Sequence, residues 1–159
     1  YAEAEQFYKR SLNIFEKSLG PENPNTATAL KTLGILYDKQ KRYAEAEPLY
    51  KRALAIYEKV FGPEHLEVAL TLNNQALFYT HLSRYDDAEQ LYKRSLTIRE
   101  KVLGPQHPVV ATSLSNLGLL YYNQGRYAEA ERLYKRSLAI REKILGPEHP
   151  GVATIRRLG

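Results

Sequence analysis

The sequence repeats itself every 42 residues. The repeated unit begins with Tyr-Ala-Glu-Ala-Glu at residues 1, 43 and 127, and with Tyr-Asp-Asp-Ala-Glu at residue 85. Gly-Pro pairs recur at the same spacing, at residues 20, 62, 104 and 146. A fixed period in this range is typical of solenoids, in which each unit buries its apolar face only against its neighbours. The functional question is therefore which surface of the array binds a partner.

Each unit contains two segments with helical periodicity. In residues 110–123, leucines and a tyrosine fall on one face of a helix together with Gly118. In residues 127–145, an apolar face is flanked by Glu131 and Lys135, four residues apart in the favourable order. The Gly-Pro pair that follows the second segment ends it, since glycine favours a left-handed conformation and proline cannot continue a helix. Every full unit is therefore expected to be a helix pair.

These signals define the predicted architecture, an all-α, right-handed α-solenoid of antiparallel helix pairs. The predicted order is a lone second helix at about residues 2–19, three helix pairs at about 24–61, 66–103 and 108–145, and the start of another first helix from residue 150. We expect a single solenoid domain over residues 1–159, divided into a half repeat 1–20, repeats 21–62, 63–104 and 105–146, and a partial repeat 147–159. Both ends look like cuts through a longer array.

The turn between the two helices of a pair differs between repeats. Gly125 occupies this turn in the third repeat, where a residue with positive φ is expected, but Lys41 and Ser83 stand at the matching positions. Residues with a Cβ atom adopt positive φ at an energetic cost that glycine avoids. The sequence therefore predicts that the first two turns are either strained or differently shaped.

These residues resemble a known repeat family. The pattern Leu114-x-x-Leu117-Gly118-x-x-Tyr121, followed by Tyr127 and then by Ala130-x-x-x-Tyr134, resembles the tetratricopeptide repeat (TPR), with leucine in place of the usual tryptophan. The longer 42-residue unit is similar to the TPR domain of kinesin light chains and related bacterial arrays. The resemblance covers essentially the whole chain. It implies a protein-protein interaction scaffold or adaptor and leaves the biological role open.

The resemblance also implies a concave groove lined by the first helix of each repeat. The residues that match the groove positions of the family are Thr28, Lys31, Ile35, Asp38 and Lys39, then Leu70, Asn73, Leu77, Thr80 and His81, then Thr112, Ser115, Leu119, Tyr122 and Asn123. Their spacing places them on one side of each helix, away from the core stripe, so we expect them to be exposed. Ile35, Leu77 and Leu119 would form an apolar row bordered by cationic and amide groups. Such a row suits a peptide with apolar anchors and acidic residues.

Two alternatives stay open at this stage. The apolar row could instead be buried between neighbouring first helices. The array could also be a structural module that associates with other copies through its ends, or that regulates its own chain, because residues 150–158 continue as a first helix and an uncapped end exposes apolar surface.

Other functional classes are disfavoured by the sequence. Histidines recur at 65, 107 and 149, but equivalent positions of packed helices lie ~8–10 Å apart, too far for one metal; a loop or capping role is expected. No phosphate-binding loop or nucleophile motif occurs, so we expect no enzyme, no cofactor and no metal.

A recurring Lys-Arg pair on the second helices could follow nucleic-acid phosphates. The lysine of each pair, however, lies one helical turn from a glutamate, and the net charge is only +5, so nucleic-acid binding is disfavoured. No apolar run could span a membrane, and the lack of cysteine favours a cytoplasmic setting.

Overall fold

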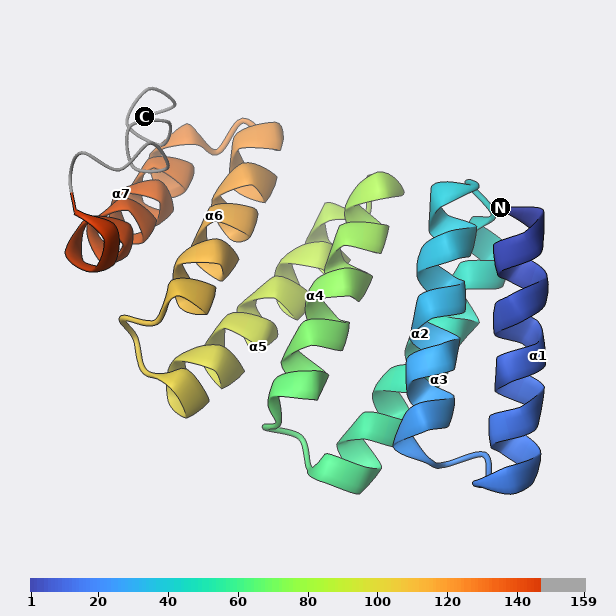
Figure 1. Ribbon diagram of the computed structural model, residues 1–159. Helices are drawn as coiled ribbons and strands as arrows, with labels where there is room; N and C mark the ends of the chain where they lie inside the picture. Colours follow the sequence, from blue (N-terminus) through green and yellow to red (C-terminus); the bar gives the residue numbers. More distant parts are fainter. Residues whose placement is uncertain (147–159) are drawn as a thin grey trace. The chain divides into compact units, whose positions relative to one another are not determined.

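The computed structural model describes residues 1–146, apart from the side chain of Leu145. These residues form seven α-helices and no strand (Figure 1). The helices are α1 (Ala2–Ser18), α2 (Pro24–Lys39), α3 (Tyr43–Phe61), α4 (Leu66–His81), α5 (Tyr85–Leu103), α6 (Pro108–Asn123) and α7 (Tyr127–Leu145). The predicted helix boundaries and the all-α class are confirmed, while the helix expected from residue 150 lies outside the described residues.

The first helices begin with a side-chain cap. The side chain of Asn23 accepts a hydrogen bond from the backbone N–H of Asn25 at 2.9 Å. His65 and His107 use Nδ1 in the same way, accepting from the N–H two residues later at 3.0 and 3.1 Å. A cap of this kind satisfies one of the backbone donors left free at a helix start. The predicted capping role of the recurring histidines is therefore confirmed for these two.

The chain divides into two compact units, Tyr1–Gln75 and a second that begins at Ala76. In the first unit α1 packs on α2, and α2 packs on α3. In the second unit α5 packs on α6, and α6 packs on α7. Within each unit, the closest packing is between the two helices of one repeat, α2 with α3 and α6 with α7.

Glycine allows this close approach within a pair. A Cβ atom on Gly118 of α6 would lie 3.2 Å from the ring of Tyr134 on α7, tighter than an ordinary contact. On Gly34 of α2 it would lie 3.5 Å from Leu49 and Tyr50 of α3. In α2 and α6, the space beside the glycine is thus filled by a tyrosine of the paired second helix. This contact explains why glycine sits within an otherwise leucine-rich stripe.

The turn between paired helices has one hydrogen-bonding pattern in all three repeats. Arg42 N–H donates to Tyr37 O at 2.8 Å, and Lys41 N–H donates to Asp38 O at 2.9 Å. The same two bonds recur around Ser83 and around Gly125, at distances of 2.8–3.0 Å. This is the Schellman pattern, whose central residue takes a left-handed conformation. Lys41, Ser83 and Gly125 have φ of 60, 58 and 78°. The three turns therefore have the same shape, and Lys41 and Ser83 adopt the strained positive φ that was predicted for them.

Candidate functional site

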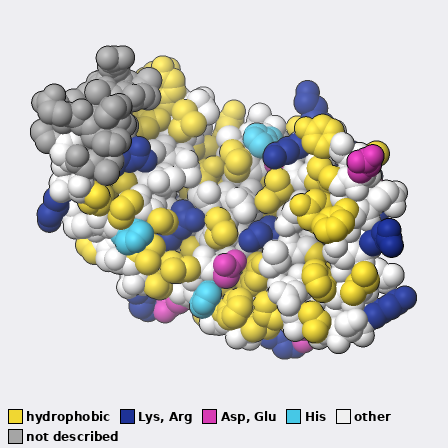
Figure 2. Space-filling view, in the orientation of Figure 1, with side chains coloured by type: hydrophobic (Ala, Val, Ile, Leu, Met, Phe, Trp, Pro, Cys, Tyr) yellow, Lys and Arg dark blue, Asp and Glu magenta, His cyan; other side chains and the backbone are white. Residues whose placement is uncertain are grey.

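The apolar row predicted for the groove is exposed at two of its three positions. Leu77 on α4 and Leu119 on α6 are 46% and 52% exposed. Their chain neighbours Phe78 and Leu120 are 0% and 1% exposed, so each helix has a buried face and a separate apolar surface position. Ile35, the third member of the row, is half-buried. Figure 2 shows hydrophobic side chains at the surface of both units, interspersed with charged ones.

Two of the predicted groove residues are buried, and the expectation that they are exposed is wrong. The ammonium group of Lys31 lies 3.7 Å from a carboxylate oxygen of Glu67 on α4 and 5.4 Å from the ring centroid of Tyr57. Asp38 is buried as well, and lies close enough to the Tyr50 phenol that its charge adds to burial in raising the Tyr50 pKa. Both residues therefore belong to the packed interior of the first unit, where Glu67 lies beside the Lys31 ammonium group and the Tyr50 phenol lies near Asp38.

The remaining predicted positions divide between partial and full exposure. Ser115 is half-buried and shares a hydrogen bond of 2.8 Å with the hydroxyl group of Ser137 on α7. Thr80 is half-buried and donates to the carbonyl of Ala76 within α4 at 2.9 Å. Asn73 is half-buried, whereas Lys39, His81, Tyr122 and Asn123 are exposed.

An aromatic pair extends the surface of the second unit. Tyr122 and Tyr127 meet edge to face, with ring centroids 5.1 Å apart, and are 54% and 61% exposed. Tyr127 was not among the predicted binding residues. The sequence did indicate it, because a tyrosine begins the second helix of each repeat and Tyr122 lies three residues after Leu119. Paired exposed aromatic rings are a common contact surface for protein partners.

Arg99 on α5 is a buried charge that the sequence analysis missed. It is 7% exposed, and its guanidinium donates to the hydroxyl group of Ser113 on α6 at 2.7 Å. Burial lowers the Arg99 pKa. Its counterpart one repeat earlier is Tyr57, whose hydroxyl group is hydrogen bonded to that of Thr28 at 2.5 Å. This position therefore presents a polar group between a second helix and a first helix in both units.

A recurring arginine links consecutive repeats within each unit. The guanidinium of Arg42 lies 4.2 Å from the Tyr37 ring centroid and donates to Glu5 at 2.7 Å. Arg126 repeats the arrangement in the second unit, 4.1 Å from the Tyr121 ring centroid and 3.0 Å from Glu89. We call these contacts the arginine links.

The arginine links shift the ionisation of the groups that form them. Glu45 and Glu5 raise the pKa of Arg42 above its ordinary value. Hydrogen bonds from Arg42 and then Lys9 lower the pKa of Glu5 from 4.5 to about 2. Charge-assisted hydrogen bonds of this kind favour the ionised form of both partners.

Carboxylates oppose the recurring Lys-Arg pairs. Each predicted Glu-Lys pair on the second helices is present, with N–O distances of 2.7, 3.2, 3.3 and 2.9 Å. Arg52 and Arg136 bind Glu16 and Glu100 of the preceding second helix at 2.7 and 3.1 Å. A track for phosphate groups needs free cations, so this arrangement favours a structural role for the basic pairs.

Over residues 1–146, no three histidine or acidic side chains come together in a way that could hold a metal ion. None of the described helices combines the length and apolar content that crossing a bilayer requires.

Comparison with known proteins identifies the repeat. The model of the tetratricopeptide repeat family matches residues 1–59, 37–100, 67–143 and 110–158. Comparison with curated protein sequences finds no match.

Solved structures of kinesin light chain type have the same fold. The crystal structure of BtubC (BKLC) from P. vanneervenii matches with a TM-score of 0.84 and 26% identity, over 94% of this chain and 59% of that chain. The nearly identical TPR-like repeats of a kinesin light chain-like protein from Podosopora anserina match with the same TM-score and identity, over 98% of this chain and 74% of that one.

A shorter TPR domain shows the fold alone. The N-terminal domain of stress-induced protein-1 from C. elegans matches with a TM-score of 0.62 and 20% identity, over 85% of this chain and 95% of that chain. Proteins built from these repeats generally serve as protein-protein interaction scaffolds. The family match covers nearly all of the sequence, and the expected all-α helical repeat fold is confirmed: the chain belongs to the tetratricopeptide repeat family.

Proposed function

We propose that the protein is a scaffold that binds a peptide segment of a partner on the exposed face of its first helices. The observation that carries this proposal is the exposure of Leu77 and Leu119 at corresponding repeat positions, each next to a fully buried neighbour, Phe78 or Leu120. An exposed apolar side chain at a fixed repeat position gains nothing for the fold. It offers instead a regular set of contacts to an extended or helical peptide.

The polar surroundings favour a peptide with apolar anchors. In the second unit the exposed leucines share their helices with His81, Tyr122 and Asn123, all of which are exposed. The amide of Asn123 can both donate to and accept from a peptide backbone. Tyr122, supported by Tyr127, can pack on an apolar or aromatic anchor.

Acidic residues in the partner would be favoured by the charge of the chain. The net charge is +5, and Lys39 on α2 remains exposed, whereas Lys31 already faces Glu67. The expected contribution of charge is therefore modest, so apolar anchors should dominate the affinity. Membership of the tetratricopeptide repeat family, whose repeats generally form protein-protein interaction scaffolds, supports this proposal.

The proposal is tested by screening the 159-residue chain against peptides that vary independently in apolar and acidic content, at low and high salt. The double substitution Leu77→Glu with Leu119→Glu should weaken binding of the selected peptides at least about ten-fold, because anchors at the centre of an interface dominate its energy. The helical circular dichroism signal should be retained, since both side chains are already exposed.

Val102→Glu supplies the matched control. Val102 lies on the second helix α5 and is 49% exposed, so the substitution adds the same charge to a similarly exposed apolar position away from the first helices. It should leave peptide binding unchanged. Selected peptides that bind the double variant as tightly as the parent chain would rule out this surface as the binding site.

A further inference from the structure

Two of the first helices begin with a cap that can take up a proton. Nδ1 of His65 accepts a hydrogen bond from the backbone N–H of Glu67 at 3.0 Å, and Nδ1 of His107 accepts from the N–H of Val109 at 3.1 Å. Asn23 stands at the same repeat position and uses its amide oxygen for the same bond, at 2.9 Å. An amide oxygen accepts at any ordinary pH, whereas an imidazole nitrogen accepts only while it carries no proton. The three caps are therefore alike in geometry and different in chemistry.

Protonation of the imidazole removes this cap and adds an unfavourable charge. The proton binds Nδ1, because Nε2 already carries the hydrogen in the tautomer that accepts at Nδ1. The backbone N–H of Glu67 or Val109 then loses its acceptor, and the imidazolium faces the positive end of the helix dipole. Histidine side chains ordinarily take up a proton between about pH 8 and pH 5. The stability that each cap provides is therefore present above this range and lost as the pH falls through it.

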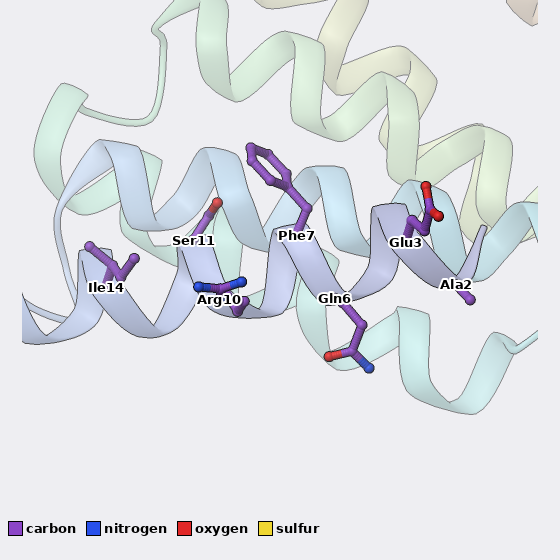
Figure 3. Close-up of a pocket in the computed structure, with 7 residues that line it drawn as sticks. All are labelled: Ala2, Glu3, Gln6, Phe7, Arg10, Ser11 and Ile14. Carbon is purple, nitrogen blue, oxygen red and sulfur yellow. The ribbon is translucent and has the colours of Figure 1, made fainter.

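The second helices have no cap of this kind. The N-cap residues of α3, α5 and α7 are Arg42, Arg84 and Arg126, and their side chains make no cap hydrogen bond. Helix α1 also begins without a side-chain cap, and the residues that line the pocket along it include no histidine (Figure 3). Loss of the histidine caps would therefore act on the starts of α4 and α6, and would leave those of α2 and the second helices unchanged.

The turn around His65 contains both acids and bases. Glu64 and Glu67 flank the histidine in the chain, and the Phe61 ring of α3 stacks on the imidazole with ring centroids 4.4 Å apart. The charged groups on the adjoining turns of α2 and α3 are Lys31, Glu58 and Lys59. The carboxylates reduce the electrostatic cost of an imidazolium at this position. Protonation nevertheless removes the acceptor that the Glu67 N–H uses, so the cap is lost.

His107 has no acidic neighbour in the chain. It is half-buried and lies between Gln106 and Pro108. Gln106 corresponds to Glu22, which binds Lys59 of α3 at 2.5 Å in the first unit. The charged groups in the last turns of α5 and α7, the two helices that pack on α6, are Glu100, Lys101, Glu142 and Lys143. Protonation of His107 therefore adds a charge to a helix start that has no carboxylate adjacent in sequence.

We propose that His65 and His107 make the first helices of the second and third repeats acid-sensitive. Below neutral pH α4 and α6 lose their N-terminal cap, whereas α2 keeps the cap that Asn23 provides. The device is regulatory because α4 and α6 carry Leu77 and Leu119, so acid would loosen the two helices of the peptide surface. This last consequence rests on the proposed function, whereas the acid response of the helices does not.

Urea denaturation of the 159-residue chain at about pH 7.5 and about pH 5.5 tests the proposal. The midpoint of the parent chain should fall by about 1 M between the two, about 0.5 M for each cap. His65→Asn with His107→Asn should remove most of this fall, since asparagine caps at both pH values. His65→Ala with His107→Ala should give a low midpoint at both. The two double variants lose the stacking on Phe61 equally, so the difference between them measures the caps.

Other titrating groups contribute equally to the three chains. Glu5 stays ionised over the whole range because Arg42 and Lys9 lower its pKa to about 2. His81 and His149 are present in every variant, so their effects cancel in the comparison.

Nitrogen NMR of the imidazole rings supplies a second test that needs no variant. At about pH 7.5 the single ring proton of His65 and of His107 should lie on Nε2. A proton on Nδ1 of both residues would overturn the proposal, as would an asparagine variant whose midpoint falls as far as that of the parent chain. Peptide binding at the higher pH, where all caps are intact, should be unchanged in the asparagine variant. Failure here is therefore separable from failure of the proposed function.

Discussion

The turn between paired helices provides three copies of one backbone that differ in their central residue. Lys41 and Ser83 adopt φ of 60 and 58°, and Gly125 adopts 78°, with the same two closing hydrogen bonds in each case. A Cβ atom built on Gly125 would meet no heavy atom within 4 Å. Exchanging glycine and other residues in these turns therefore changes the backbone energy without creating a clash or a cavity.

The magnitude follows from two opposing contributions. A residue with a Cβ atom in the left-handed region costs roughly 1–2 kcal/mol, which glycine avoids. Glycine in turn loses more conformational entropy on folding, at a cost of roughly 0.5–1 kcal/mol. Lys41→Gly and Ser83→Gly should therefore each raise the free energy of unfolding by about 0.5–1 kcal/mol. Gly125→Ser should lower it by a similar amount.

Urea denaturation followed by circular dichroism measures these changes. With a slope of about 2 kcal/mol per M of urea, each glycine substitution should raise the midpoint by about 0.3–0.5 M. The two turns are far apart in sequence and share none of the hydrogen bonds that close them, so the double variant should show the sum of the two shifts.

Alanine variants separate the backbone effect from the loss of the native side chain. Lys41→Ala and Ser83→Ala retain the Cβ atom and its strain, so they should leave the midpoint close to that of the parent chain. Equal stabilisation by alanine and by glycine would refute the reasoning, because the gain would then come from removing lysine or serine rather than from relieving positive φ.

Two further predictions concern the arginine links and the helix-pair contacts. Because Arg42 and Lys9 depress the pKa of Glu5 to about 2 in the folded protein, the stability that Glu5 provides is present above its ordinary pKa of 4.5 and is lost as pH falls toward 2. Acid titrations of stability should accordingly show a shallower decline for Glu5→Gln than for the parent chain, and identical slopes would contradict the assignment. Gly34→Ala should raise the free energy of unfolding by up to about 1 kcal/mol, since alanine is the better helix former and its Cβ would make ordinary contacts. Gly118→Ala should gain less in the same urea assay, because the ring at 3.2 Å must move, and an equal gain would show that the contact is not tight.

The helices could be predicted closely because their signals are local. Gly-Pro pairs, N-terminal prolines and a 3.6-residue apolar period all lie within a few residues of the boundaries that they define. The predicted start of α2 at residue 24 and end of α3 at residue 61 coincide with the structure. The exposed positions of Leu77 and Leu119 were also predicted, since a helix whose core stripe is known leaves the opposite face to the surface.

The burial of the charged groove positions could not be predicted in this way. Lys31 is covered because Glu67 and Tyr57, on two other helices, come within reach of its ammonium group. Likewise, the four-residue spacing of Glu5 and Lys9 predicts only an ion pair within one helix. The contact of Glu5 with Arg42 joins residues 37 apart and depends on how one repeat packs on the next. Periodicity in a single helix contains no information about such contacts.

The arginine links have a consequence for how arrays of this kind change in length. The glutamate and the arginine of each link belong to adjacent repeats, and the same pair occurs at Glu5–Arg42 and at Glu89–Arg126. Duplication or loss of a segment of 42 residues, starting at any point, leaves a glutamate facing an arginine at the new boundary. An insertion of another length would separate them. Recombination in whole repeats thus changes the number of repeats but preserves the 37-residue spacing between the glutamate and the arginine.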